Sequence, residues 1–328
     1  MKEIKVGILG AGRMGKLHGE LIIKIPDVKL VGIFDTNLEK AQELAKQLDV
    51  RIYKTEEEII NDLDINTFII ATPTPFHYSS IIKIAERGGN IFCEKPLART
   101  LREGEEIVKV VIKNKIKFGI NFQRRFSWPE KRIKELIPLL GEPKAGRIAY
   151  INAGYKRKKG DWFADFDKCG GFILDTMIHL FDLFRWYFGD VKSVFANGLL
   201  LSQSLSEPMD YAFVNLTFKN EFIGLVEGGW IRRGVGIGFT CYLIGTEGTI
   251  VYDEKDGKIK VFTKNKNFEE LRKEEDFSPV FESLKTFIKK LKNEDINFPS
   301  IEDGIETLRI ALSAIKSAQK GETVYLTQ

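Results

Sequence analysis

Three ionisable side chains interrupt an otherwise apolar segment in the middle of the chain. Asp175, His179 and Asp182 stand among phenylalanine, isoleucine, leucine and methionine residues. At about 100° per residue, an α-helix would place all three within about 60° of one another. A helix that is apolar on its remaining sides is normally buried, and burying ionisable groups without partners is costly. The pattern therefore predicts one buried helix over residues 172–188 with a single polar stripe.

The residues of this stripe suit proton transfer. A histidine titrates near neutrality without assistance, so His179 could take the proton of a substrate hydroxyl. Asp175, one helical turn earlier, could orient the imidazole and stabilise its protonated form. The alternative is an i,i+4 pair of Asp175 and His179 that satisfies itself inside a core. For Asp182 three alternatives stay open: a bond to Arg185, a bond to a backbone amide, or a contact with substrate.

A glycine-rich turn near the N-terminus predicts nucleotide binding. Residues 4–9 are a short, mainly apolar run, followed by GAGRMG at positions 10–15 and then by a helical pattern. Gly10 permits the turn, Gly12 lets a pyrophosphate approach the backbone, and Gly15 lets the helix pack on the strand. The phosphates would bind N–H groups at the helix N-terminus. The predicted dinucleotide contacts in this turn are Gly10, Gly12, Arg13 and Met14.

An acidic residue after the second strand indicates which dinucleotide binds. The run at 28–34 is followed by Asp35, whose carboxylate can accept both hydroxyls of the adenosine ribose and would repel a 2′-phosphate. Thr36 beside it is small and polar, so NADP is disfavoured and stays the alternative. The sequence therefore predicts NAD, with Asp35 and Thr36 at the ribose.

Strand and helix patterns then alternate through residue 122, as a doubly wound parallel sheet requires. Two loops follow buried strands, at the sheet edge where ligands of open α/β sheets bind. The loop at 72–77 contains two prolines, which predicts a fixed loop without helix. The other loop carries Lys95 between Glu94 and Pro96, either directed toward the cofactor crevice or exposed like most loop lysines. The predicted cofactor contacts here are Thr72, Pro73, Thr74, His77, Glu94 and Lys95.

The pattern changes in the second half of the chain. A strand-like run at 147–155 and six more between residues 193 and 262, joined by short turns, predict an α+β domain with a large open, mainly antiparallel sheet. We therefore predict an α/β Rossmann domain over 1–122 and a substrate-binding α+β domain over 123–328. Because an open sheet needs cover for its second face, we expect a homodimer or homotetramer formed through that sheet.

Composition narrows the class of protein. The chain has 328 residues, 43% hydrophobic and 29% charged, as in an ordinary globular protein with two cores. A net charge of +4 gives no basis for binding nucleic acid or a membrane surface, and no run resembles a signal peptide or a membrane span. Cys93, Cys169 and Cys241 lack metal-site spacing. We expect a cytoplasmic protein that binds no metal.

Together these motifs resemble the Gfo/Idh/MocA family of nicotinamide-dependent oxidoreductases, and within it the inositol and sugar dehydrogenases. The resemblance spans the whole chain. It rests on GILGAGRMG with His18 following, ATPTPFH at 71–77, CEKPLA at 93–98, GG-x3-D-x3-H-x2-D at 170–182 and the ending at 302–326. It implies that His179 is the general acid/base, that Asp175 is its partner, and that Lys95 binds a substrate oxygen and aligns the nicotinamide.

The expected function is that of an NAD-dependent dehydrogenase, which transfers hydride between nicotinamide and a secondary hydroxyl of a cyclic polyol, sugar or sugar derivative. Arg124, Tyr155 and Trp162 are expected at the substrate, with surface exposure or core packing as alternatives. Two other functions stay open. One is an NAD-using glycosidase or lyase that oxidises its substrate transiently, and the other is a non-catalytic nucleotide or sugar sensor.

Overall fold

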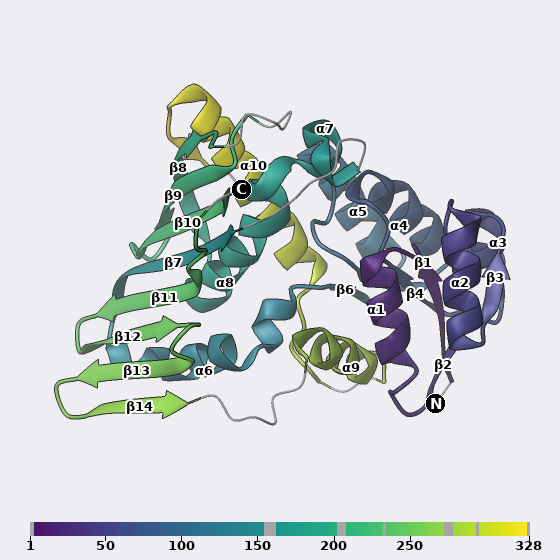
Figure 1. The fold of residues 1–328 in the computed structure, drawn as a ribbon, viewed down its shortest axis with the longest axis horizontal. Coiled ribbons are helices and arrows are strands. Elements are labelled where there is room, and N and C mark those ends of the chain that lie inside the picture. The colour runs from purple at the N-terminus through teal and green to yellow at the C-terminus, as the bar shows by residue number, and fades with distance from the viewer. Residues whose placement is uncertain are drawn as a thin grey trace. The chain divides into compact units, whose positions relative to one another are not determined.

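The chain divides into two compact units, each of which is built on one β-sheet (Figure 1). The computed structural model describes residues 3–153, 162–201, 208–231, 234–271, 278–292 and 295–326. The first unit contains residues up to Gln123 together with the described part of Phe277–Ile305. The second unit runs from Arg124 to Asp276 and resumes at Glu306.

The first unit is a doubly wound α/β fold, as predicted. Its six-stranded sheet, counted over the described residues, is parallel throughout and has the order β3-β2-β1-β4-β5-β6. The order reverses between β1 and β4, and ligands of open α/β sheets bind at such a point. The strands are β1 (Ile4–Leu9), β2 (Val28–Phe34), β3 (Arg51–Tyr53), β4 (Thr67–Ile70), β5 (Asn90–Cys93) and β6 (Phe118–Ile120).

Two of the helices that follow these strands begin at residues whose side chains cap the helix N-terminus. The Asn37 side chain accepts a hydrogen bond from Lys40 N at the start of α2, and Thr100 forms a capping box with Glu103 at the start of α5. The helix α1 packs against both α2 and α9, and α4 packs against α5. The helices are α1 (Arg13–Ile22), α2 (Leu38–Leu48), α3 (Glu56–Asn61), α4 (His77–Glu86), α5 (Leu101–Lys113) and α9 (Pro279–Leu291).

The division between the units differs from the predicted one at α9 and the segment that follows it. The sequence placed these residues in the second domain, whereas they pack with the first. The reason is an aromatic cluster in which Phe287 and Phe298 lie 5.3 and 6.1 Å from the ring of Phe92 in β5. Gly119 in β6 makes room for both rings, because a Cβ there would lie 2.5 Å from Phe298. Phe287 and Phe298, which are far from β6 in the sequence, thus complete the core beside this strand.

The second unit contains a large open sheet, which confirms the predicted fold class. Over the described residues it has nine strands in the order β14-β13-β12-β11-β7-β10-β9-β8-β15, and every neighbouring pair except β7–β10 is antiparallel. The sequence prediction missed β14 and β15. The strands are β7 (Pro143–Ala153), β8 (Val191–Leu199), β9 (Tyr211–Phe218), β10 (Ile223–Ile231), β11 (Gly238–Gly245), β12 (Gly248–Asp253), β13 (Lys258–Thr263), β14 (Asn267–Leu271) and β15 (Val324–Tyr325).

Helices of the second unit cover one face of this sheet. The helix α8 (Ile178–Phe188) lies against β7 and β10, and α6 (Trp128–Leu136) lies beside β12. The short α7 (Phe166–Cys169) precedes α8, and α10 spans Ile301–Lys320. Residues alternate between buried and exposed along β9, so the other face of the sheet is open within this chain.

The open face carries apolar side chains. Its exposed members are Phe213, Ile223, Tyr242, Ile244 and Phe262. At the centre, Glu227 is buried beneath Arg147 and Tyr211, to which it is joined by short hydrogen bonds. We call this surface the open sheet face.

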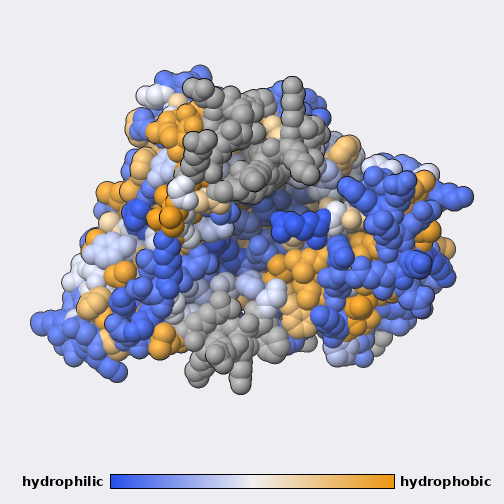
Figure 2. Space-filling view, viewed as in Figure 1, coloured by the Kyte–Doolittle hydropathy of each residue, from blue (hydrophilic) through white to orange (hydrophobic). Residues whose placement is uncertain are grey.

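Polar residues prevail on the face of the molecule that is drawn in Figure 2. The face drawn in Figure 2 is mainly hydrophilic, with apolar residues in smaller groups among the polar ones. No helix within the described residues combines the length and apolarity that crossing a membrane requires. None of the three cysteines forms a disulfide.

Candidate cofactor and catalytic sites

The glycine-rich turn has the geometry that its sequence predicts. Gly10 has a φ of 101°, and a Cβ there would lie 2.6 Å from the Ala71 carbonyl oxygen. A Cβ on Gly15 would lie 1.8 Å from the Gly10 carbonyl oxygen, so α1 can pack this closely only on glycine. Gly12 is different, because a Cβ there would meet nothing within 4 Å. The space in front of Gly12 is therefore open.

Asp35 lies beside this turn and fixes it. Its carboxylate accepts hydrogen bonds from Ala11 N at 2.6 Å and from Asn37 N at 2.8 Å. Each carboxylate oxygen can accept further bonds, so the group can hold the turn and still receive ribose hydroxyls. Thr36, next to it, is exposed.

These residues fit a dinucleotide. Gly12 is the N-cap residue of α1, and no side chain among the described residues caps the N–H groups at this helix N-terminus. N–H groups at such a terminus stabilise a bound anion. Arg13 and Met14 form the first turn of α1, with Arg13 exposed and Met14 half-buried. The open space, the uncapped helix and the carboxylate at the end of β2 together match a pyrophosphate and its adjoining ribose.

The proline-containing loop after β4 is partly helical, which corrects the sequence prediction. Thr74–Phe76 forms a 3₁₀ turn and His77 begins α4. Pro75 is tolerated because the first residues of a helix donate no intrahelical hydrogen bond. Thr72 and Pro73 precede this turn and are half-buried, whereas Thr74 is buried.

His77 is buried and joins the two loops of the predicted site. Its Nε2 lies 2.9 Å from the Thr72 carbonyl oxygen, and its Nδ1 lies 2.9 Å from the Pro96 carbonyl oxygen. A neutral imidazole has one N–H, so it can donate to only one of these carbonyls at a time. Burial lowers the pKa of His77, and the two carbonyl oxygens oppose that shift. The structure thus places His77 between the loops rather than on their surface.

Glu94 is held inside the first unit by two side chains. Its Oε1 accepts hydrogen bonds from His18 Nε2 at 2.7 Å and from Asn121 Nδ2 at 2.8 Å. Burial alone would raise the pKa of Glu94, but the bonds from His18 and Asn121 outweigh it and hold the pKa below its usual value. Lys95 follows at the turn, is half-buried, and is joined to Pro96 by a cis peptide bond.

The segment that carries Asp175 and His179 is one continuous helix over residues 171–188, which confirms the predicted helix. It contains a π-helical turn at Ile173–Met177 and continues as α8. Single π turns inside helices are common at functional sites. Asp175 and His179 are both half-buried while their apolar neighbours are buried, so these two side chains lie on the accessible side of the segment. The Thr176 hydroxyl donates to Asp175 Oδ2 at 3.1 Å.

Asp182 does not share that accessible side. It is fully buried and accepts two hydrogen bonds from Arg125, at 2.9 Å from Nε and at 2.6 Å from Nη2. Arg185, the partner considered from sequence, instead donates to Asp190 at 3.2 Å. Asp182 follows His179 by three residues of regular α-helix, which is about 60° around the helix axis, and that step places it on the buried side of α8. The observed ion pair is therefore with Arg125, a partner that was not among the alternatives considered for Asp182.

The remaining predicted substrate residues lie in different settings. Arg124 donates to the buried Glu130 at 2.7 Å and lies over the rings of Tyr150 and Phe239, at 4.9 and 4.6 Å. Trp162, in a 3₁₀ turn at Trp162–Ala164, is 36% exposed. Tyr155 lies outside the described residues. Arg124 is thus an aromatic-flanked, ion-paired side chain rather than a surface residue.

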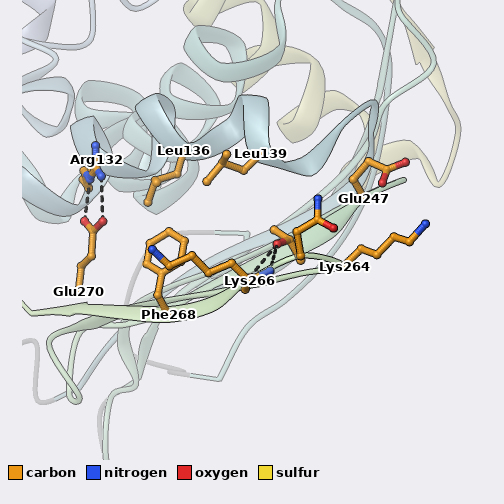
Figure 3. Close-up of a pocket in the computed structure, with 10 residues that line it drawn as sticks. Arg132, Leu136, Leu139, Glu247, Lys264, Lys266, Phe268 and Glu270 are labelled. Carbon is orange, nitrogen blue, oxygen red and sulfur yellow. Dashed lines mark hydrogen bonds and ion pairs between the residues drawn. The ribbon is translucent and has the colours of Figure 1, made fainter.

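One cavity of about 570 Å³ opens elsewhere in the second unit (Figure 3). Its walls are Leu136 and Leu139 on one side and the β13–β14 hairpin with Lys266 and Phe268 on the other. The Arg132–Glu270 pair closes one end, with Nε and Oε2 2.6 Å apart. None of the predicted site residues lines this cavity. It is distinct from the candidate catalytic residues of the same unit.

Sequence reasoning missed several residues that hold the site residues in place. Arg125 binds Asp182, Asn121 binds Glu94, and Ser283 in α9 donates to Asn121 Oδ1 at 2.9 Å. A signal did exist for Asn121, because it is a polar residue directly after the buried strand β6, and polar residues are uncommon in cores. Ser283 gave none, because it lies 162 residues from its partner.

Comparison with known proteins agrees with the architecture of both units. The description "Oxidoreductase family, NAD-binding Rossmann fold" matches residues 4–122, and "GFO/IDH/MocA C-terminal domain" matches residues 131–251. The chain is 29% identical to myo-inositol 2-dehydrogenase of Thermotoga maritima over 99% of both proteins. It is 32% identical to scyllo-inositol 2-dehydrogenase (NAD(+)) of Bacillus subtilis over 76% of this chain and 73% of that protein. A crystal structure of a probable dehydrogenase from Thermotoga maritima superposes with a TM-score of 0.83, at 28% identity and 98% coverage of each chain.

Proposed function

This chain belongs to the Gfo/Idh/MocA family of NAD-binding oxidoreductases, and from that membership we propose that it is an NAD-dependent dehydrogenase of a cyclic polyol, sugar or sugar derivative. The observation that carries the proposal is the likeness to two inositol 2-dehydrogenases, one of them along essentially the whole chain. The half-buried Lys95, Asp175 and His179 supply the groups that oxidation of a secondary alcohol needs. The specific hydroxyl is expected to be inositol-like or aldose-like.

The first unit binds the cofactor in this proposal. N–H groups of the turn at Gly10 and Gly12 and of the first turn of α1 receive the pyrophosphate. The Asp35 carboxylate receives the ribose hydroxyls and favours NAD over NADP through its charge. Thr36, Thr72, Pro73 and Thr74 lie on the loops that follow β2 and β4, at the carboxyl edge of the sheet. Bound nicotinamide supplies the hydride acceptor.

Three side chains act on the substrate. His179 takes the hydroxyl proton during oxidation and returns it in the reverse direction. Asp175 orients the imidazole and stabilises its protonated form. The Lys95 ammonium stabilises the charge that develops on the substrate oxygen. Arg124 and Trp162 contact the more distant hydroxyls of the ring.

The test is a screen of cyclic polyols and aldoses with NAD and with NADP, followed by the absorbance of the reduced cofactor. We expect reduction of NAD with at least one inositol or aldose, and a lower kcat/KM with NADP. Substrate conversion without net formation of reduced cofactor would instead indicate a glycosidase or lyase that oxidises its substrate transiently. Cofactor binding without any conversion would indicate a sensor.

The roles of the side chains are tested by substitution. His179→Ala and Lys95→Ala should each lower kcat by at least about 100-fold, the lower end of the range for losing one acid–base or electrostatic group. The Kd for NAD, measured by titration calorimetry, should change little for His179→Ala. Full activity in either variant would contradict the role given to that residue.

We also propose that two or four copies assemble through the open sheet face. The support is its row of exposed apolar side chains, with Ile223 56% exposed and Tyr242 41% exposed, on a face that a monomer would leave in water. Sedimentation should show a dimer or tetramer at micromolar concentration. Ile223→Asp should shift it toward monomer, whereas the control Leu63→Asp, at a 93% exposed site in the first unit, should not. A wild-type monomer would refute the assembly.

A further inference from the structure

We propose that Glu94 and its buried partners His18, Asn121 and Ser283 are positioning residues that aim the Lys95 ammonium. The inference rests on the proposed function, because it takes Lys95 to be the cation at the substrate oxygen. It assigns Glu94 a role different from the cofactor contact that its sequence position suggests. All of these residues lie in the first unit.

The side chain of Glu94 is fixed from three elements. It is 7% exposed, and its Oε1 accepts from His18 in α1 and from Asn121 after β6. Asn121 is itself oriented by Ser283 in α9, whose hydroxyl donates to Oδ1 at 2.9 Å. His18, Asn121 and Ser283 are each at most 1% exposed. Each member is buried and bonded to at least one other member, while His18 Nδ1 is buried without a hydrogen-bond partner in the described residues. The three bonds that are made restrict how Glu94 can be arranged.

The backbone around Lys95 is fixed as well. The Glu94 N–H donates to the Ile70 carbonyl oxygen at 2.9 Å, and the Cys93 thiol donates to the Glu94 carbonyl oxygen at 3.2 Å. On the other side, the Pro96 carbonyl oxygen lies 2.9 Å from His77 Nδ1. Leu97 and Ala98 are fully buried. Lys95 is thus a half-buried side chain whose neighbours on both sides are held by hydrogen bonds and burial, which restricts its reach.

The simpler reading is that the network only stabilises the core. That reading is incomplete, because an apolar residue would serve a core equally well and a buried carboxylate needs partners that cost desolvation. The network is also placed at the one turn that carries Lys95 and joins it to α1, whose N-terminus fits the pyrophosphate. Misplacing a catalytic group by about 1 Å can slow a reaction about 100-fold.

The experiment measures kcat, the Kd for NAD and the isotope effect on kcat. The substrate is the polyol that reduces NAD fastest in the screen, deuterated at the carbon that is oxidised. Glu94→Ala should lower kcat about 100-fold and raise the isotope effect, because hydride transfer becomes slower, with the Kd for NAD within about 3-fold of wild type. Glu94→Gln keeps an acceptor at Oε1 and should recover most of kcat. A purely structural loss lowers the amount of active enzyme and leaves the isotope effect unchanged.

A matched pair of serines provides the control. Ser283→Ala removes the far end of the network, whereas Ser317→Ala removes an equally buried helix serine in the second unit, which donates to the Glu322 carbonyl oxygen and accepts from Ala196 N. Both should lower the melting temperature, but only Ser283→Ala should lower kcat and raise the isotope effect. If Glu94→Ala does not fold, Asn121→Ala and Ser283→Ala decide the question.

The outcomes separate this inference from the proposed function. If Lys95→Ala is inactive while Glu94→Ala, Asn121→Ala and Ser283→Ala keep the wild-type kcat and isotope effect, the positioning role is overturned and the dehydrogenase proposal stands. If Lys95→Ala is fully active, the role of Lys95 itself fails, whatever the Glu94 variants do. Equal effects of Ser283→Ala and Ser317→Ala on kcat would also overturn the positioning role.

Discussion

Removing the Asp182 carboxylate should destabilise the second unit strongly. In Asp182→Ala, the Arg125 guanidinium would remain at a site where it is 7% exposed, without the carboxylate that receives two of its N–H groups. The change therefore removes the carboxylate partner of a buried charge, which is the costly way of breaking an ion pair.

The magnitude follows from the two hydrogen bonds. A hydrogen bond to a charged group contributes about 1.5–3 kcal/mol, so losing both costs about 3–6 kcal/mol. This agrees with the roughly 3–5 kcal/mol measured when one partner of a buried pair is removed. For a unit of this size each kcal/mol lowers the melting temperature by about 2–4 °C, and we expect a decrease of about 6–20 °C.

Differential scanning calorimetry of Asp182→Ala, the control Asp256→Ala and the wild type at equal protein concentration measures this effect. Asp256→Ala is the control, because Asp256 pairs with Lys260 at 3.0 Å with both side chains partly exposed, and such pairs contribute at most about 1 kcal/mol. The double variant Arg125→Met/Asp182→Leu should recover most of the loss, since apolar residues of similar volume often replace a buried pair without cost. A loss for Asp182→Ala no larger than that for Asp256→Ala would refute the reasoning.

Two further predictions concern the first unit. Gly12→Ala should fold normally but raise the Kd for NAD at least 10-fold, because its Cβ enters only the space in front of the turn. Gly15→Ala should instead lower the melting temperature, because its Cβ would lie 1.8 Å from the Gly10 carbonyl oxygen. Calorimetry and NAD titration of both variants separate the two effects, and equal melting temperatures would contradict the assignment. Burial lowers the pKa of His77 below its usual 6.5, so the unfolded chain binds that proton more readily than the folded protein. The free energy of unfolding should therefore be highest above pH 6.5 and should decrease as the pH falls below 6.5. Urea unfolding between pH 7.5 and 5.5 should show a smaller decrease in His77→Asn, and an unchanged decrease would rule out His77 as its source.

The architecture was predictable because each part of it has a local cause. The turn at 10–15 needs glycine where the structure shows a positive φ at Gly10 and a close approach at Gly15. Alternating burial along β9 reproduces the period of two in its sequence. The short β14 and β15 were missed because one has no buried side and the other has two residues.

The parts that could not be predicted depend on long-range packing. The π turn at Ile173–Met177 has no signal of its own in residue spacing, and the Arg125 that pairs with Asp182 lies 57 residues earlier in the chain. One partner of Glu94 is the Asn121 amide, which is oriented by Ser283, a residue 162 positions further along the chain than Asn121. Side-chain pairs of this kind become visible only when the strands and helices that carry them are placed.

The aromatic layer beside Gly119 bears on how this protein is made. Phe92 and Gly119 emerge from the ribosome long before Phe287 and Phe298, whose rings cover them. At roughly 5–20 residues per second, synthesis of the intervening stretch lasts roughly 10–40 seconds. Throughout that interval the nascent nucleotide-binding half exposes an unfinished apolar surface, which is a natural place for a chaperone to bind. A shortened gene that ends at residue 122 would leave that surface permanently uncovered, and its product should aggregate.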